Sequence, residues 1–192
     1  MTQHIQPVPL AKFYRLINHG STVLVSAKHS NTVNAMSAAW ACALDFDKLT
    51  VVLDKAAYTR GLIEQSDWFA VQIPTVAQAE LVLHLGSHSR HTTPGKMDGI
   101  GLFYQEGFDV PLIENCAAWI VCKLLPEAHN QQAYDLFIGE VVAAWADERI
   151  FQNGRWLFEQ APDAMRTLHY MAGGQFYAIG KGINLNRDSA PD

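Results

Sequence analysis

Three consecutive residues, Tyr58, Thr59 and Arg60, have side chains suited to holding a phosphate group. They follow the apolar segment 49–53, which reads as a short buried strand, and they open the segment 58–66, which has helical spacing. Unpaired N–H groups at a helix start attract anions, and an arginine can bind two phosphate oxygens at once. An ordinary helix start, with Thr59 as the cap and Arg60 in solvent, is the alternative that spacing alone favours.

A second candidate is the run of small side chains from Asn34 to Trp40. It lies within a predicted strand over 33–41, where Val or Ile would ordinarily be expected. Small residues let a flat ring approach the backbone, whose N–H and C=O groups can bond the edge of the ring. Tight packing at a subunit interface explains the same residues equally well.

Three histidines, His84, His88 and His91, stand close together in the chain. The first two are four residues apart, which is the spacing of helical metal sites. However, Gly86 and Ser87 interrupt the helical pattern, and no acidic residue or cysteine is adjacent. We therefore expect no metal site, and instead a polar loop, with Lys96 close behind, that can reach a phosphate or the rim of a cofactor.

Several common functional classes lack support in this chain. There is no GxGxxG, no GxxxxGK[ST] and no GxSxG, so the usual dinucleotide, P-loop and α/β-hydrolase signatures are missing. A formal net charge of −5 argues against a nucleic-acid partner. The three cysteines, Cys42, Cys116 and Cys122, are scattered and are predicted to be reduced, the last two as small core residues.

The elements that must position these residues are mostly short strands. Two helices are predicted, over 58–66 and 75–85, with a further helical turn near 94–99, and Gly139 is expected to mark a bulge or bend. Many short strands with a few inserted helices indicate a mainly β fold closed into a barrel. Strands or hairpins are predicted over residues 21–28, 33–41, 49–53, 68–73, 117–125, 134–144, 149–158 (around Asn153-Gly154) and 169–181.

One domain is expected over residues 1–192, with a loose polar tail from about residue 184. The first residues do not have the pattern of a signal peptide, and no apolar stretch reaches the roughly 20 residues needed to cross a bilayer. We therefore expect a cytoplasmic protein with no membrane partner.

Four segments, in this order, resemble the flavin reductase-like family, which has the FMN-binding split-barrel fold. They are VLVSAKHSNTVNAMSAAWACALDFD, LTVVLDKAAYTRGLIEQSDWFAVQIP, DLFIGEVVAAWAD and LHYMAGGQFYAIGK. The second segment is the most specific, and the last is most similar to the flavoredoxin-like branch. The resemblance runs from about Ser21 to Lys181.

This resemblance implies a homodimer with FMN near the subunit interface. The ring of the flavin would lie along the segment from Asn34 to Trp40, held largely by main chain. The phosphate would meet Thr59 and Arg60. The residues that the resemblance assigns to the cofactor are Asn34, Ala35, Met36, Ser37, Ala38, Trp40, Lys55, Tyr58, Thr59, Arg60, Ser87 and Lys96.

The resemblance also implies an oxidoreductase that passes electrons from NAD(P)H to FMN and on to an acceptor. Tyr134 stands where many members carry a histidine close to the nicotinamide, and a phenol does not titrate near neutral pH as histidine does. No acid–base side chain is required, because the cofactor carries the chemistry. The alternative is a non-enzymatic FMN protein that passes electrons between protein partners.

Overall fold

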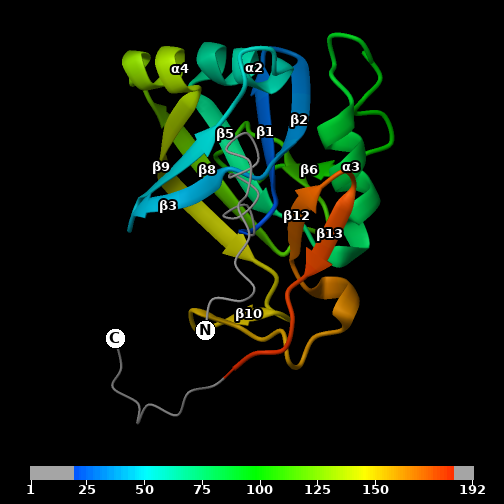
Figure 1. The fold of residues 1–192 in the computed structure, drawn as a ribbon. Helices are drawn as coiled ribbons and strands as arrows, with labels where there is room; N and C mark the ends of the chain where they lie inside the picture. The colour runs from blue at the N-terminus through cyan, green and yellow to red at the C-terminus, as the bar shows by residue number, and fades with distance from the viewer. Residues whose placement is uncertain (1–19, 184–192) are drawn as a thin grey trace, which may run out of the picture.

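The computed structural model describes residues 20–183, and its centre is a curled sheet of seven antiparallel strands (Figure 1). The order across the sheet is β2-β1-β5-β8-β9-β4-β3. The predicted mainly β fold with a few helices is confirmed.

Four strands form one half of the sheet. β1 (Val23–His29) pairs with β2 (Thr32–Ala38) through a tight turn, and β5 (Trp68–Ile73) joins β1 to β8 (Ala118–Leu125). The turn depends on Ser30, which has a positive φ of 53°. β1, β5 and β8 are rich in Val, Ile, Leu and aromatic residues, as buried strands generally are, whereas most side chains of β2 are small.

The other half continues from β8 into β9 (Leu136–Ala146), β4 (Lys48–Val52) and β3 (Ala41–Asp45). The predicted single strand over 33–41 is wrong, because the chain leaves β2 after Ala38 and starts β3 at Ala41. β2 and β3 therefore lie at opposite ends of the sheet order although only two residues separate them. The sheet curls so that these ends approach one another, and the barrel is split between them.

Within residues 20–183, three α-helices lie against the sheet. α2 (Tyr58–Ser66) places Leu62 and Ile63 in the concave interior, where they pack with residues of β1, β4 and β5. α3 (Ala79–Ser87) follows a single 3-10 turn, η2 (Val76–Gln78), and packs on the other face of β1 and β2. α4 (Ala128–Tyr134) precedes β9, so the predicted strand start at Tyr134 is wrong.

Small hairpins complete the described chain. β6 (Leu102–Phe103) pairs with β7 (Leu112–Ile113), and β10 (Phe151–Gln152) pairs with β11 (Arg155–Trp156). Asn153 and Gly154 both have positive φ, as the predicted Asn-Gly hairpin requires. After η3 (Asp163–Met165), β12 (Leu168–Ala172) and β13 (Gln175–Ala178) form the last hairpin, beside α3 in Figure 1.

Gly139 lies in regular pairing with Leu49 and Leu124, so the bulge predicted at Gly139 is wrong. The register of β8 and β9 shifts instead at the step between Val121 and Cys122. A Cβ at position 139 would lie 2.5 Å from Cζ of Phe69. A glycine is therefore required here by the Phe69 ring, which fills the barrel interior.

Cys116 and Cys122 are buried, as predicted, and Cys42 is exposed. Burial raises the pKa of both buried thiols to about 12, so they stay protonated and packed as small apolar groups. Among the described residues, no helix is long and apolar enough to cross a membrane.

Candidate functional site

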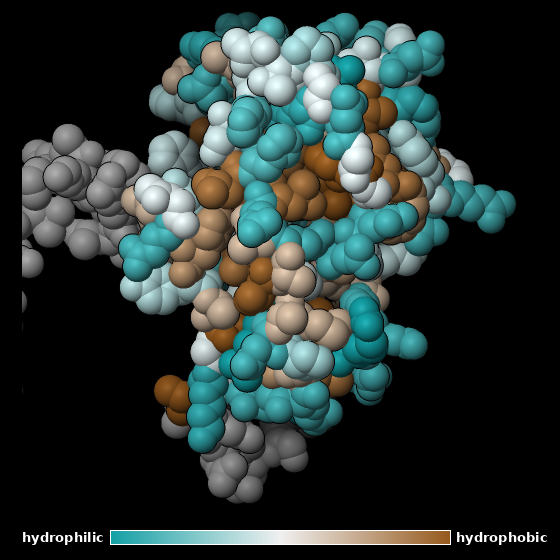
Figure 2. Space-filling view, turned by 90° about the vertical axis from the view of Figure 1, so that its right-hand side faces the viewer, coloured by the Kyte–Doolittle hydropathy of each residue, from teal (hydrophilic) through white to brown (hydrophobic). Residues whose placement is uncertain are grey.

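Three adjoining hollows open along β2, and Ser37 lines all of them. We call them the basic hollow, which contains Lys96 and Arg90, the apolar hollow, which contains Val82 and Phe176, and the open hollow, which contains Trp40 and Gly173. Figure 2 shows the side of the molecule that carries α3 in Figure 1, where apolar side chains form a band between hydrophilic regions. Three hollows that adjoin one another beside one strand form a groove, and this groove suits an elongated ligand whose ends differ in polarity.

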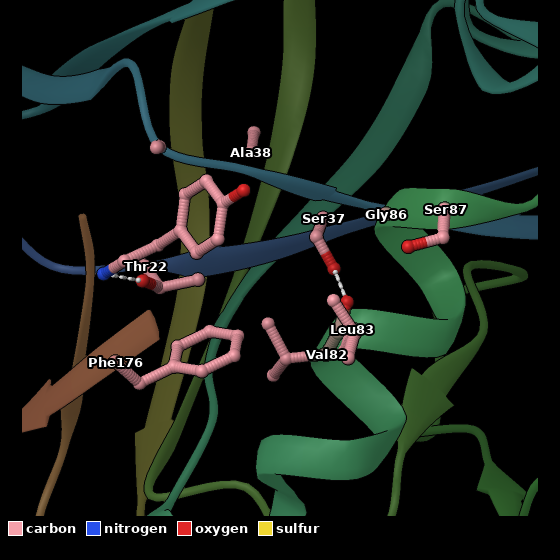
Figure 3. A pocket seen from close by; sticks show the side chains of 10 residues that line it. Thr22, Ser37, Ala38, Val82, Leu83, Gly86, Ser87 and Phe176 are labelled. Atoms are coloured by element: carbon pink, nitrogen blue, oxygen red, sulfur yellow. Dashed lines mark hydrogen bonds between the residues drawn. The ribbon is translucent and has the colours of Figure 1, made fainter. Parts of the chain in front are cut away.

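The apolar hollow lies between β2, α3 and the β12–β13 hairpin (Figure 3). Val82 and Phe176 form one wall, and Thr22 lies opposite Ser87 across the hollow. The Ser37 hydroxyl donates a hydrogen bond of 2.6 Å to the carbonyl oxygen of Val82, which fixes α3 against β2. The remaining lining residues include Ala38, Ala39, Leu83, Gly86 and Tyr170.

Gly86 lies inside α3, which continues to Ser87, so the interruption predicted there is wrong. The close approach of helix and strand explains the glycine, because a Cβ at position 86 would lie 3.4 Å from Cβ of Ser37. The helix thereby brings Ser87 into both the apolar and the basic hollow. Ser37, one of the small residues that the sequence analysis identified on β2, therefore packs closely against Gly86 of α3.

The basic hollow lies between β2, the start of α2 and the loop after α3. Lys96 is only 3% exposed, and its Nζ donates a hydrogen bond of 2.9 Å to the carbonyl oxygen of Leu85 at the end of α3. Burial lowers the pKa of Lys96 to about 8. Among the ion pairs of the described residues, none includes Lys96. The polar residues of this hollow include Asn34, Asp54, Thr59, Ser87, His88, Ser89, Arg90 and Lys96.

Arg90 also lines the basic hollow, and sequence reasoning missed it as an individual residue. Its Nη1 donates a hydrogen bond of 2.6 Å to the carbonyl oxygen of Val33, and its guanidinium lies 5.8 Å from the ring centre of Tyr58. The His91 ring contacts the same tyrosine edge-on at 4.9 Å. These contacts hold the loop after α3 against β2 and α2. The only sequence signal was the polar segment Ser87–Arg90 itself.

Arg60 does not line the basic hollow, contrary to the sequence-based assignment. Arg60 as a residue is 7% exposed, and its guanidinium donates hydrogen bonds to Glu64 at 2.8 Å, to Asp135 at 2.5 Å and to the carbonyl oxygens of Leu53 and Gln131. Burial alone would lower the pKa of Arg60, but the hydrogen bonds to the two carboxylates outweigh it and raise the pKa. The donors of Arg60 are therefore used to join α2 to the α4–β9 turn.

Thr59 is buried and lines the basic hollow, but it does not cap α2. The N-cap is Ala57, which offers no side-chain hydrogen bond. The Thr59 hydroxyl instead accepts a hydrogen bond of 2.8 Å from Nδ2 of Asn34. The Oδ1 atom of Asn34 is buried without a hydrogen-bond partner.

The open hollow lies at the far end of β2, where the barrel is split. It is lined by backbone and side chains of Met36–Trp40 and of Tyr170–Gly173, together with Asp54 and Asp135. Trp40 and Tyr170 supply its aromatic surface. The carboxylates of Asp54 and Asp135 are its only charged groups, and Asp54 lines the basic hollow as well.

Three other residues predicted to lie at the site line none of the three hollows: Ala35, Lys55 and Tyr134. Ala35 is fully buried against α3, so only its main chain is available to a ligand. Lys55 lines a separate depression beyond Tyr58. Tyr134 is 63% exposed at the end of α4, against the His129 ring, and lines none of the three hollows.

The histidines of the loop are used in local contacts. Nε2 of His84 lies 2.9 Å from the carbonyl oxygen of Lys96, and Nδ1 of His88 lies 3.0 Å from the carbonyl oxygen of His84. The described part of the chain holds no group of three or more His, Cys, Asp or Glu residues placed to bind a metal ion. These histidines position Lys96 and the end of α3.

A sequence model of the family described as "Flavin reductase like domain" matches residues 14–177. An FMN-binding domain of a flavin reductase-like enzyme from Shewanella baltica OS155 is 54% identical, with a TM-score of 0.86, over 93% of this chain and 96% of that one. The uncharacterized protein YddH of Escherichia coli strain K12 is 39% identical over 92% of this chain and 96% of its own length. Flavoredoxin from Methanosarcina acetivorans, at 19% identity, shares the fold with a TM-score of 0.73 over 95% of each chain.

Proposed function

We propose, from the premise that this chain belongs to the flavin reductase-like family, that it binds FMN along β2 and acts as an oxidoreductase. The proposed electron donor is NAD(P)H, and the reduced flavin would pass its electrons to an acceptor. The relative from Shewanella baltica, which is described as an FMN-binding domain, supports the choice of cofactor.

One observation carries this proposal: a buried cation without a carboxylate ion pair in residues 20–183 stands at one end of the groove, next to an apolar hollow. Lys96 has no carboxylate partner among the described ion pairs, and burial of such a cation is unfavourable unless an anion joins it. The next hollow along the strand is apolar, and its floor is the small-residue stretch of β2. FMN has this sequence of parts, a phosphate, a hydroxylated chain and a flat ring, so the residues present fit the group.

We assign the phosphate to the basic hollow. Lys96 and Arg90 would supply the positive charge, and Ser87 and Thr59 would supply hydroxyl groups. This assignment replaces the predicted contribution of Arg60, whose donors are already bonded within the protein. The ring would lie over Ser37 and Ala38, where side chains are small enough for it to approach the backbone.

The bound flavin would accept a hydride from a nicotinamide and release electrons to a second substrate. The chain contributes position and electrostatics. The open hollow gives access to the groove from solvent, and Trp40 and Tyr170 offer aromatic surface on which a planar donor can stack. Tyr134, which lies outside this hollow, is assigned no part in holding the donor.

A second candidate function is electron transfer to a protein partner. Exposed apolar side chains on the β3–β4 hairpin favour it, namely Leu44 and Phe46, of which Phe46 is fully exposed in the single chain. The same surface is our proposed homodimer contact, because large exposed apolar patches mark interfaces. Sedimentation of the purified protein separates these roles: a dimer that covers the hairpin leaves no such surface for another protein.

The test of the main proposal is spectroscopic. Protein purified with FMN should show flavin absorbance and should bind FMN more tightly than riboflavin, because riboflavin lacks the phosphate. Anaerobic addition of NADH or NADPH should then bleach the bound flavin. Equal affinity for FMN and riboflavin would contradict the phosphate assignment. Tight FMN binding without bleaching would favour the electron-transfer alternative.

A further inference from the structure

Asp135 lines the open hollow, and contacts from inside the protein fix its position. It ends α4 in a left-handed conformation, with a φ of 55°, and its main-chain oxygen accepts a hydrogen bond of 2.8 Å from the N–H of Leu53. Its Oδ1 accepts a hydrogen bond of 2.5 Å from Nη1 of Arg60, whose side chain is 8% exposed. The Arg60 guanidinium also lies 5.1 Å from the ring centre of Phe137. The direction of the Asp135 carboxylate is therefore set before any ligand arrives.

The second carboxylate oxygen of Asp135, Oδ2, is left for a ligand. Within residues 20–183 the side-chain hydrogen bond of Asp135 goes through Oδ1, and no hydrogen bond reaches Oδ2. The side chain is 27% exposed and lines the open hollow. A carboxylate oxygen accepts hydrogen bonds and donates none. A ligand group that meets Oδ2 must therefore carry an N–H or an O–H.

The other carboxylate of the open hollow is held differently. Asp54 is exposed on the loop between β4 and α2, and its Oδ1 accepts a hydrogen bond of 2.7 Å from the N–H of Ala56 in the same loop. Among the described ion pairs, none includes Asp54. An exposed carboxylate exchanges bonds to water for bonds to a ligand, so its net gain is small, whereas an acceptor that is already oriented loses less on binding. Asp135 is therefore the better prepared acceptor of the two.

The walls of the open hollow suit a flat ring. Trp40 and Tyr170 offer aromatic surface there, and the proposed function places the reduced nicotinamide on it. The ring nitrogen of a nicotinamide dinucleotide carries the sugar, so the N–H groups of this ring all belong to its carboxamide. A carboxamide beside Asp135 can present either its C=O or its NH₂ to the carboxylate, and only the NH₂ makes a hydrogen bond.

We propose that Oδ2 of Asp135 accepts a hydrogen bond from the carboxamide NH₂ of the nicotinamide donor, so that the open hollow recognises the amide and orients the ring. The inference rests on the proposed function, which places the donor in this hollow. Arg60 acts as a positioning residue, because its Nη1 holds Oδ1 and leaves Oδ2 for the ligand. The contact with the donor thus falls to Asp135 rather than to the neighbouring Tyr134, which lines none of the three hollows.

The experiment compares three reduced dinucleotides that differ only in the group on the ring. NADH carries a carboxamide, its thionicotinamide analogue retains the NH₂, and its 3-acetylpyridine analogue has a methyl group in that place. Anaerobic stopped-flow bleaching of the FMN-loaded protein gives a second-order rate constant for each. Division by the rate constant of the same donor with free FMN removes the intrinsic reactivity of the ring. In the native protein this normalised rate should be about tenfold higher for the two NH₂ donors than for the acetyl donor, the worth of a hydrogen bond to a charged group.

Asp135→Asn tests the acceptor itself. Asparagine matches aspartate in size and tolerates the left-handed conformation. Because Nη1 of Arg60 donates to Oδ1, the amide must turn its Nδ2, which is a donor, toward the hollow. The carboxamide and the acetyl group both have a C=O to offer that donor, so the preference for the NH₂ donors should be lost. Asp54→Asn is the matched control, because it removes the same charge from the same hollow and should leave the preference in place.

Arg60→Met is a second variant. It should reduce the preference for the NH₂ donors, because the carboxylate is no longer held, while the ratio of FMN to riboflavin affinity stays unchanged.

The outcomes separate this inference from the proposed function. A native protein without the preference, or a preference that survives in Asp135→Asn, would overturn the inference. Equal loss in Asp54→Asn would overturn it as well, because charge rather than a hydrogen bond from Asp135 would then select the donor. If neither NADH nor NADPH bleached the FMN-loaded native protein, the donor assignment of the proposed function would fail too. Bleaching without any preference leaves that assignment standing and removes the role of Asp135 alone.

Discussion

The affinity for FMN should depend on pH through Lys96. Burial lowers the pKa of this lysine to about 8, so in the ligand-free protein it loses its proton just above neutral pH. A phosphate beside the ammonium group favours the charged form and raises the pKa in the complex. Because the bound state holds the proton more tightly, the affinity is highest near pH 7, where Lys96 is charged and most of the phosphate is a dianion, and falls as the pH rises through 8.

The magnitude follows from the fraction of protein that carries the charge. With a pKa of about 8, Lys96 is roughly nine-tenths protonated at pH 7 and roughly one-tenth protonated at pH 9. The dissociation constant for FMN should therefore rise about tenfold between these two pH values, provided that the pKa in the complex lies above 9. Fluorescence titration at half-unit steps from pH 6.5 to 9.5 measures this directly.

Two controls isolate the effect. Riboflavin lacks the phosphate and should show no such slope. Lys96→Met should bind FMN weakly at every pH. It retains the other ionisable groups of the hollow's wall, so any slope left in it belongs to them: Asp54, Tyr58, His88 and Arg90. A native FMN affinity that stays level from pH 7 to 9, or an equal slope for riboflavin, would refute the assignment of the phosphate to Lys96.

Further substitutions test other parts of the structure. Lys96→Met should stabilise the ligand-free protein by on the order of 1–3 kcal/mol below pH 8, an advantage that shrinks as the pH rises from 8 toward 10.5, as denaturant unfolding at pH 7 and 10 would show. Arg60→Met should lower the free energy of unfolding by about 1–4 kcal/mol, because it leaves the carboxylate of Asp135 without its cation. The ratio of FMN to riboflavin affinity should stay unchanged, and a fall in that ratio would show that Arg60 binds the phosphate. Gly139→Ala should cost about 1–3 kcal/mol in thermal unfolding, because its Cβ would meet the Phe69 ring, and a neutral result would mean that the ring moves aside freely. Phe46→Asp should convert dimer to monomer in sedimentation; a native monomer at micromolar concentration would remove the proposed interface.

Local sequence patterns were sufficient for most of the elements. The hairpin at Asn153-Gly154 follows from the positive φ that both residues adopt readily, and α2 was predicted with the bounds observed. Errors occurred where a residue's conformation depends on distant contacts. Nothing near Gly139 in the chain reveals the Phe69 ring, and Tyr134 continues an apolar pattern into β9 although it ends α4.

The candidate site was predicted in part. The small residues of β2, Thr59, Ser87 and Lys96 do line one groove. Our proposal assigns the phosphate to Arg90 in place of Arg60, because Arg60 is bonded to carboxylates that no motif reveals. Asp135, 75 residues beyond Arg60 in the chain, binds the guanidinium that the sequence pattern assigned to phosphate.

The sequence by itself determined the family, the mainly β class and the stretch of small residues on β2, because these depend on residue types in order along the chain. Only the tertiary structure decided which cation remains without a carboxylate and which amide remains without a partner. Charge pairing and hydrogen bonding are settled by distances of about 3 Å between groups from separate elements. The unmatched Lys96 and the unbonded Oδ1 of Asn34 therefore became visible only when β2, α2 and the loop after α3 were brought together.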